Sequence, residues 1–288
     1  MNRILGFSTL GFILLIAFYS NANYFIFGHT FSGDESASFL TIVEMMKIES
    51  QLAQKDLASN ATIAKDHAEH IGEHLTANNS KEINERNPRL ATELNNTLSD
   101  FVKTFDSAKP SESAVKDKAS NLGDVISEVI SARIDKQQLD NVTVKALVVN
   151  DLVGETLEHY NSSLGLSEAS HDKNNTSTSN STETPKIMDE ADYQSAQAAV
   201  SRAIDLYNEI KPSGNTNSTE LGKSLNLLKD TIDSKSPFDQ ADKKVDDKIT
   251  PLLNGIFKLG LAEEEAHGGE GQDHGGNESK ASSGNETH

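Results

Sequence analysis

The chain has 288 residues and a formal net charge of −18, with 26 Lys and Arg against 44 Asp and Glu. This balance excludes nucleic acid as a partner, because neutralising phosphates needs clustered basic side chains. A hydrophobic content of 35% with 6% aromatic residues and no Trp favours helical bundles over compact β-sandwiches. The chain has no Cys, so any bound metal must be held by His, Asp and Glu.

The first 28 residues have the pattern of a signal peptide or membrane anchor. Arg3 precedes an uncharged apolar run at residues 4–19, and small residues of the kind that signal peptidase recognises follow at 20–23. A second apolar patch at 24–27 extends the run toward the roughly 20 residues of a membrane-spanning helix, so cleavage stays open. We therefore expect an extracytoplasmic protein that is secreted, at the cell surface or membrane-anchored.

Asn-x-Ser/Thr sequons are frequent, as in a glycoprotein. They begin at Asn60, Asn78, Asn95, Asn141, Asn161, Asn174, Asn175, Asn180, Asn217, Asn277 and Asn285. Their concentration in predicted turns and linkers supports an exterior location, although polar residues collect in such segments without glycans as well.

The remainder is predicted to be all-α. Residues 34–137 are expected to form a first four-helix unit, because apolar residues recur there at helical spacing. Its first helix covers residues 36–58, and Asn60 caps a second that reaches Leu75. A third begins at Pro88 and continues to Phe105, and Pro110 opens a fourth that continues to Ile134.

Residues 138–262 are expected to form a second four-helix unit. Its helices are predicted at 141–164, 189–210, 219–234 and 238–261, the last one kinked or restarted at Thr250-Pro251. A Ser/Thr/Asn-rich insertion at 166–187 and a His/Gly/Glu tail at 263–288 are predicted to be disordered, because neither can bury a core.

The two units look like an internal duplication. Residues 84–88 and 208–212 both read Asn-Glu-x-x-Pro before a Leu-rich helix, and residues 105–110 and 232–237 both end such a helix with x-Asp-Ser-x-x-Pro. The alternative is that amphipathic helices simply resemble one another. In this alignment the positions of His67, His70 and His74 are taken by Ala199, Arg202 and Leu206.

One helix face is rich in histidine. His67, His70 and His74 lie along one edge of the apolar face of the second helix, since each residue turns the helix by about 100°. Imidazoles three or four residues apart can reach the same metal ion. The alternative is a polar shoulder beside the core.

Carboxylates and one further imidazole on other helices would complete such a site. Glu49 lies among the apolar residues of the first helix, while Asp151, Glu155 and His159 share a face of the helix at 141–164. Bundles place metal sites where side chains of this kind converge from facing helices. The alternative is that Asp151 and Glu155 lie at a solvated end.

Two resemblances follow from particular segments. His70-Ile71-Gly72-Glu73 resembles the His-x-x-Glu part of the signature of imelysin-like periplasmic iron-uptake proteins, with Ala68 where the family has Gly. The segments 29–40, 64–75 and 81–87 resemble secreted helical proteins of ammonia-oxidising archaea. The second resemblance implies an archaeal setting of copper-dependent membrane metabolism.

These patterns support two functions. The first is an extracytoplasmic bundle that binds a transition metal (Cu, Zn or Fe) for uptake, storage or delivery. The second is a non-catalytic structural or accessory subunit, whose partners are membrane proteins or other cell-surface subunits. No catalytic motif stands out, since a di-metal carboxylate oxidase would need Glu-x-x-His pairs on two helices.

Overall fold

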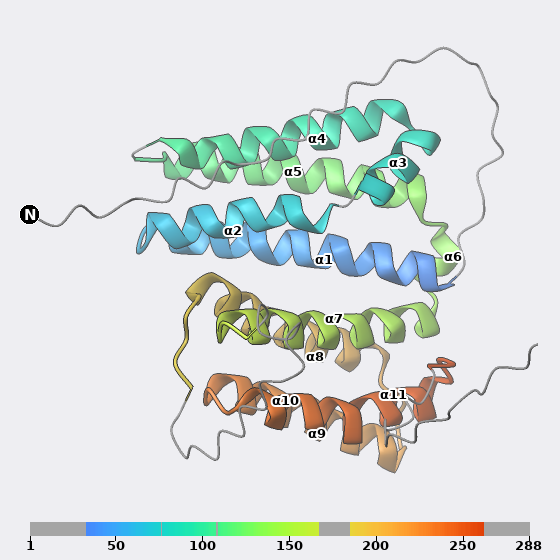
Figure 1. Ribbon diagram of the computed structural model, residues 1–288. Coiled ribbons are helices and arrows are strands. Elements are labelled where there is room, and N and C mark those ends of the chain that lie inside the picture. The colour runs from blue at the N-terminus through green and yellow to red at the C-terminus, as the bar shows by residue number, and fades with distance from the viewer. Residues whose placement is uncertain (1–32, 76, 108, 167–184, 262–288) are drawn as a thin grey trace, which may run out of the picture. The chain divides into compact units, whose positions relative to one another are not determined.

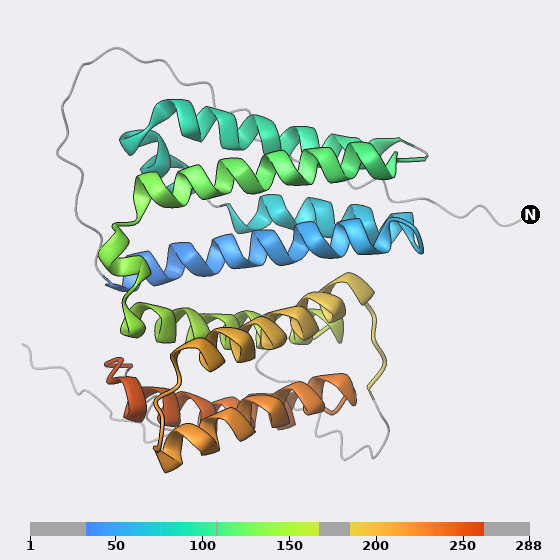
Figure 2. The same cartoon turned by 180° about the vertical axis from the view of Figure 1, so that it is seen from behind.

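The computed structural model describes residues 33–75, 77–107, 109–166 and 185–261. These residues form helices and connections without a strand, which confirms the all-α prediction (Figures 1 and 2). The predicted signal or anchor segment, residues 167–184 of the insertion and the tail lie outside the described residues. Within the described ranges, no helix is both long and apolar enough to cross a membrane.

The chain divides into two compact units, Met1–Asp140 and Asn141–His288, which we describe separately as unit 1 and unit 2. The division lies close to the predicted boundary at 137–138. In each unit, four helical segments pack around one core. The duplication itself stays a prediction.

Unit 1 is built on four long helices that lie side by side (Figures 1 and 2). They are α1 (Gly33–Asp56), α2 (Ala61–His74), α4 (Pro88–Lys103) and α5 (Glu112–Arg133). Helix α1 contacts α2 and α5, and α4 contacts the same two helices, so the four enclose one core. The short helices α3 (Ala77–Arg86) and α6 (Lys136–Leu139) and the 3-10 turn η1 (Thr104–Asp106) were not predicted.

Side-chain caps explain where the helices of unit 1 begin. The Asn60 side chain accepts hydrogen bonds from the backbone N–H groups of Thr62 and Ile63, as predicted for the start of α2. Asn87 caps α4, and Pro88 occupies its first turn, where a missing N–H costs nothing. Ser111 rather than Pro110 caps α5, so the predicted start of this helix was two residues early.

The core of unit 1 consists mainly of aliphatic side chains together with three phenylalanines, Phe39, Phe101 and Phe105. Phe101 and Phe105 meet edge to face, with ring centroids 5.3 Å apart. Ile71 and Leu122 are almost completely buried beside them in the same apolar cluster. Each such side chain stabilises the fold by about 1.5–3 kcal/mol relative to an exposed position, and this shared core joins the four long helices of unit 1.

Unit 2 contains α7 (Val142–Ser163), α8 (Glu190–Ile210) and α9 (Thr216–Asp233), followed by a last helix in three parts. These parts are α10 (Phe238–Lys244), the π-helical turn η3 (Val245–Ile249) and α11 (Thr250–Phe257). The interruption confirms the predicted kink. Because Pro251 has no N–H and its ring crowds the preceding turn, the chain widens into a π-turn just before it.

The sequon asparagines of the described residues do not lie in open linkers. Asn60 and Asn141 are helix caps whose side-chain oxygens accept backbone hydrogen bonds. Four others, Asn78, Asn95, Asn161 and Asn217, lie within helices. The expected location in turns therefore holds for Asn60 and Asn141, which lie in the connections before α2 and α7, but not for the four asparagines within helices. Glycosylation stays a prediction.

Candidate metal site

Helices α1 and α2 bring one carboxylate and two imidazoles together inside unit 1. Glu49 lies on the stripe that includes Met46 and Ala53, so the packing of α1 carries its carboxylate into the core. The packing of α2 carries His67 into the core in the same way, because His67 shares the buried face of this helix with Ala64 and Ile71. Glu49 and His67 are both 0% exposed. Burial of such groups costs free energy unless they meet polar partners, and they meet each other.

The ring nitrogens converge on one carboxylate oxygen. Nδ1 of His67 lies 2.7 Å from Oε2 of Glu49, and Nδ1 of His70 lies 3.8 Å from the same oxygen. One ligand atom from each of the three side chains lies within 4.8 Å of the other two. The two imidazole planes are 88° apart, so their nitrogens approach the oxygen from different directions.

Their spacing is close to that of ligands on one metal ion. Bonds of about 2.0–2.2 Å to a shared ion put ligand atoms roughly 3–3.5 Å apart. The Glu49–His67 separation is slightly shorter than this, and the Glu49–His70 separation slightly longer. Small side-chain rotations would therefore admit an ion, and the 19% exposed side chain of His70 leaves this part of the cluster open to solvent.

Asp56 is a neighbour that the sequence reasoning missed. Its Oδ2 lies 3.7 Å from Nε2 of His67, on the side of the ring opposite Glu49. The residue is 7% exposed. A sequence signal existed, because Asp56 follows Glu49 by seven residues, which is two helical turns along the same face of α1.

The remaining predicted ligands are in different positions. His74 is half-buried one turn beyond His70 on α2. Asp151, Glu155 and His159 belong to α7 of unit 2, where each is half-buried. The predicted convergence of these residues with the histidines of α2 stays a prediction.

In unit 2 the imidazole of His159 lies between two carboxylates. Nδ1 is 2.8 Å from Oδ1 of Asp192, and Nε2 is 3.9 Å from Oε2 of Glu155. Asp192, which was not predicted, is placed by the first turn of α8, where its N–H donates to the capping Asp189. The two carboxylates face different ring nitrogens, and the 2.8 Å contact with Asp192 ties α7 to α8.

Unit 1 buries another charge away from the histidines. The guanidinium of Arg133 pairs with Glu82 and stacks 4.0 Å from the ring centre of Phe39. Burial lowers the pKa of Arg133 from its ordinary value, although the carboxylate of Glu82 opposes this. The group stays positively charged at neutral pH. It joins α5 to α3 and α1, and it offers no metal ligand.

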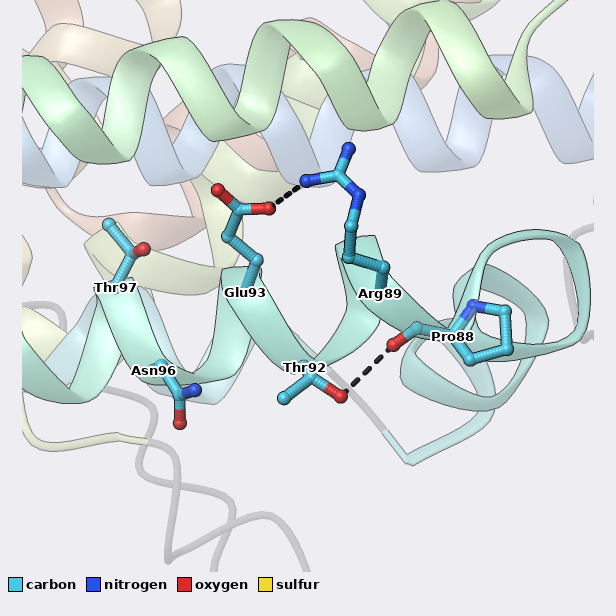
Figure 3. A pocket seen from close by; sticks show the side chains of 6 residues that line it. All are labelled: Pro88, Arg89, Thr92, Glu93, Asn96 and Thr97. Carbon is cyan, nitrogen blue, oxygen red and sulfur yellow. Dashed lines mark hydrogen bonds and ion pairs between the residues drawn. The ribbon is translucent and has the colours of Figure 1, made fainter. Parts of the chain in front are cut away.

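The surface of α4 has a hollow that lacks this chemistry (Figure 3). It is lined by Pro88, Arg89, Thr92, Glu93, Asn96 and Thr97. Figure 3 shows the side chain of Arg89 directed to Glu93 and the hydroxyl of Thr92 donating to the Pro88 carbonyl over 3.0 Å. These contacts lie within one helix, and all the lining residues belong to α4, so the hollow is a depression between side chains of this helix. No histidine lines it.

No family model matches the chain, and neither the curated proteins nor the solved structures contain a significant match to it.

Proposed function

We propose that this protein is an extracytoplasmic helical bundle that binds a transition metal ion for uptake, storage or delivery, with Glu49, His67 and His70 as ligands. The observation that carries the proposal is the convergence of one carboxylate oxygen and two imidazole nitrogens within 4.8 Å. The apolar segment and small residues near the N-terminus support the extracytoplasmic location.

A buried ion pair alone accounts for less of this arrangement. One imidazole is enough to pair with Glu49, and burying such a pair is commonly no better for stability than packing apolar side chains there. A second imidazole aimed at the same oxygen adds desolvation cost without being needed for that pair. A metal ion would use all three donors at once.

The donor set limits the metal. Nitrogen and carboxylate ligands without sulfur suit Zn(II), Cu(II) and iron, whereas Mg²⁺ and Ca²⁺ prefer oxygen ligands throughout. The net charge of −18 raises the local concentration of any cation around the protein.

The alternative function is a structural or accessory subunit of a membrane or cell-surface assembly. In that case the Glu49–His67 pair only stabilises unit 1, and the purified protein takes up no stoichiometric metal. Metal content therefore separates the two functions directly.

The test is metal analysis of the full chain, produced without a histidine tag and dialysed against zinc or copper. Histidines elsewhere would bind metal loosely, so the parent protein carries alanine at His171, His267, His274 and His288. In this parent we expect one tightly held ion. Glu49→Gln and His70→Ala should lose it while circular dichroism shows that both variants remain helical.

Glu69→Gln is the matched control, because Glu69 lies next to His70 in sequence but is exposed on α2. It should bind as the parent does. A parent protein that retains no metal, or equal metal in all four proteins, would overturn the proposal.

A further inference from the structure

We propose that Asp56 is a positioning residue that lets His67 bind metal through Nδ1. This inference rests on the proposed metal site. It concerns a carboxylate that the proposed ligand set does not include.

The position of Asp56 is unusual for a carboxylate. It is the last residue of α1, 7% exposed, and its Oδ2 receives no hydrogen bond within the described part of the chain. Such a buried acceptor is costly unless a donor reaches it in some state of the protein. Nε2 of His67 lies 3.7 Å from this oxygen, which is longer than a hydrogen bond.

The two carboxylates face the two nitrogens of one imidazole. Nδ1 of His67 lies 2.7 Å from Oε2 of Glu49. Because an ionised carboxylate can only accept a hydrogen bond, this contact places a ring proton on Nδ1 when no metal is bound. A metal ion can bind Nδ1 only after that proton leaves. The neutral ring must then carry its proton on Nε2, the nitrogen that faces Asp56.

Asp56 supplies the acceptor that this second tautomer needs. A shift of about 1 Å turns the 3.7 Å separation into a hydrogen bond from Nε2–H to Oδ2. Metal-bound histidines commonly donate their other N–H to a carboxylate, which orients the ring and makes it a stronger ligand. Glu49 and Asp56 therefore serve opposite tautomers of His67.

The experiment compares metal binding by the full chain with and without the Asp56 carboxylate. Zinc affinity is measured by competition with a chelating dye. Three proteins are compared: the parent with the four histidines replaced, and its variants Asp56→Ala and Asp56→Glu. We expect Asp56→Ala to weaken binding by about 10- to 100-fold, the usual effect of removing such a partner. Asp56→Glu should recover part of the affinity.

Asp117→Asn is the matched control, since it removes one negative charge from an exposed position on α5 of the same unit. It should leave zinc affinity unchanged. Nitrogen NMR of histidine-labelled protein supplies a readout that a purely structural role would not move. In the zinc-bound parent, the His67 ring should show metal at Nδ1 and a proton at Nε2.

The outcomes separate this inference from the proposed function. A parent that binds no zinc contradicts the metal site itself. If Asp56→Ala binds zinc as tightly as the parent does, only the role of Asp56 is contradicted. Zinc found on Nε2 of His67 would also overturn the inference, because Asp56 would then be a ligand and Glu49 the orienting partner.

Discussion

The two units bury polar groups of different kinds. In unit 1 the buried groups include ionisable side chains, namely Glu49, Asp56, His67 and Arg133. In unit 2 the largest buried polar side chains are neutral tyrosines. The hydroxyls of Tyr160, Tyr193 and Tyr207 donate to the backbone carbonyls of Ser236, Ile232 and Ser218, respectively.

We infer that this difference separates structural polarity from the polarity of the proposed metal site. A hydroxyl that donates to a backbone carbonyl is satisfied without a further ligand, and it also satisfies a carbonyl near a helix end. Ionisable groups gathered at one point stay costly unless a counter-charge or a metal joins them. Unit 2 therefore has the simpler core, and the chemistry of unit 1 is concentrated on α1 and α2.

The predicted duplication leads to the same contrast. The positions aligned with His67 and His74 are Ala199 and Leu206 on α8, and both are buried apolar residues. The aligned helix of unit 2 thus packs well without imidazoles. If the two helices are duplicates, a helix of this kind does not need the histidines in order to pack.

The largest effect is expected from breaking the buried pair of unit 1. His67→Ala leaves the Glu49 carboxylate without its imidazole partner, so the free energy of unfolding should fall by about 3–5 kcal/mol. Urea denaturation followed by circular dichroism measures this loss.

The control is the double variant Glu49→Leu/His67→Leu, which replaces both polar side chains by apolar groups. It should regain most of the stability while binding no metal. If it is as unstable as the single variant, the pair itself contributes to the fold and the contrast between the units is weaker than we infer.

The next effect is alkaline loss of stability, which should arise in unit 2. Burial raises the pKa of Tyr160 from 10.0 to about 12, and desolvation also raises the pKa values of Tyr193 and Tyr207. Above the ordinary pKa the unfolded chain loses protons that the folded chain keeps, so stability falls as pH rises.

For Tyr160 the loss should therefore be absent below pH 10 and develop between pH 10 and about 12. Tyrosinate absorbance should report titration and unfolding together. Titration of these tyrosines near pH 10 without unfolding would show that their hydroxyls are not held as described.

A smaller effect is expected from removing one hydroxyl of unit 2. Tyr160→Phe keeps the ring packed against Tyr193 and Phe238 but leaves the Ser236 carbonyl without its donor. The free energy of unfolding should fall by about 1–3 kcal/mol. The comparison variant Tyr160→Leu loses the ring as well and should be less stable still, and equal stability of Tyr160→Phe and the parent would contradict this role.

The smallest effect is expected at the surface of unit 1. Lys118 lies 2.8 Å from Asp100, and this hydrogen bond and charge lower the pKa of the Asp100 carboxyl. Lys118→Met should return that pKa toward its ordinary value in an NMR titration, with little change in the urea midpoint, because exposed ion pairs contribute little.

The contribution of this pair is present above the ordinary pKa of Asp100 and is lost as pH falls through its lowered value. Added salt should reduce it further. If Lys118→Met destabilises the protein as much as His67→Ala does, buried and surface charges contribute equally to stability, and the contrast fails.

Much of the fold was predictable because helical signals are local. Apolar residues at helical spacing, Asn60 and Asn87 as caps, and the kink at Thr250-Pro251 all depend on neighbours within a few residues. The short helices α3 and α6 were missed. Their apolar stripes are too brief to stand out, and only packing against longer helices makes them stable.

The candidate site was predictable to the level of helix faces. The sequence by itself determined that His67 and Glu49 lie on the apolar sides of their helices, since side-chain direction follows from about 100° of rotation per residue. Only the tertiary structure decided that both Nδ1 atoms meet Oε2 of Glu49 and that Asp56 faces Nε2 of His67. Those contacts depend on how α1 packs against α2 and on which rotamers that packing leaves open, and no local pattern encodes either.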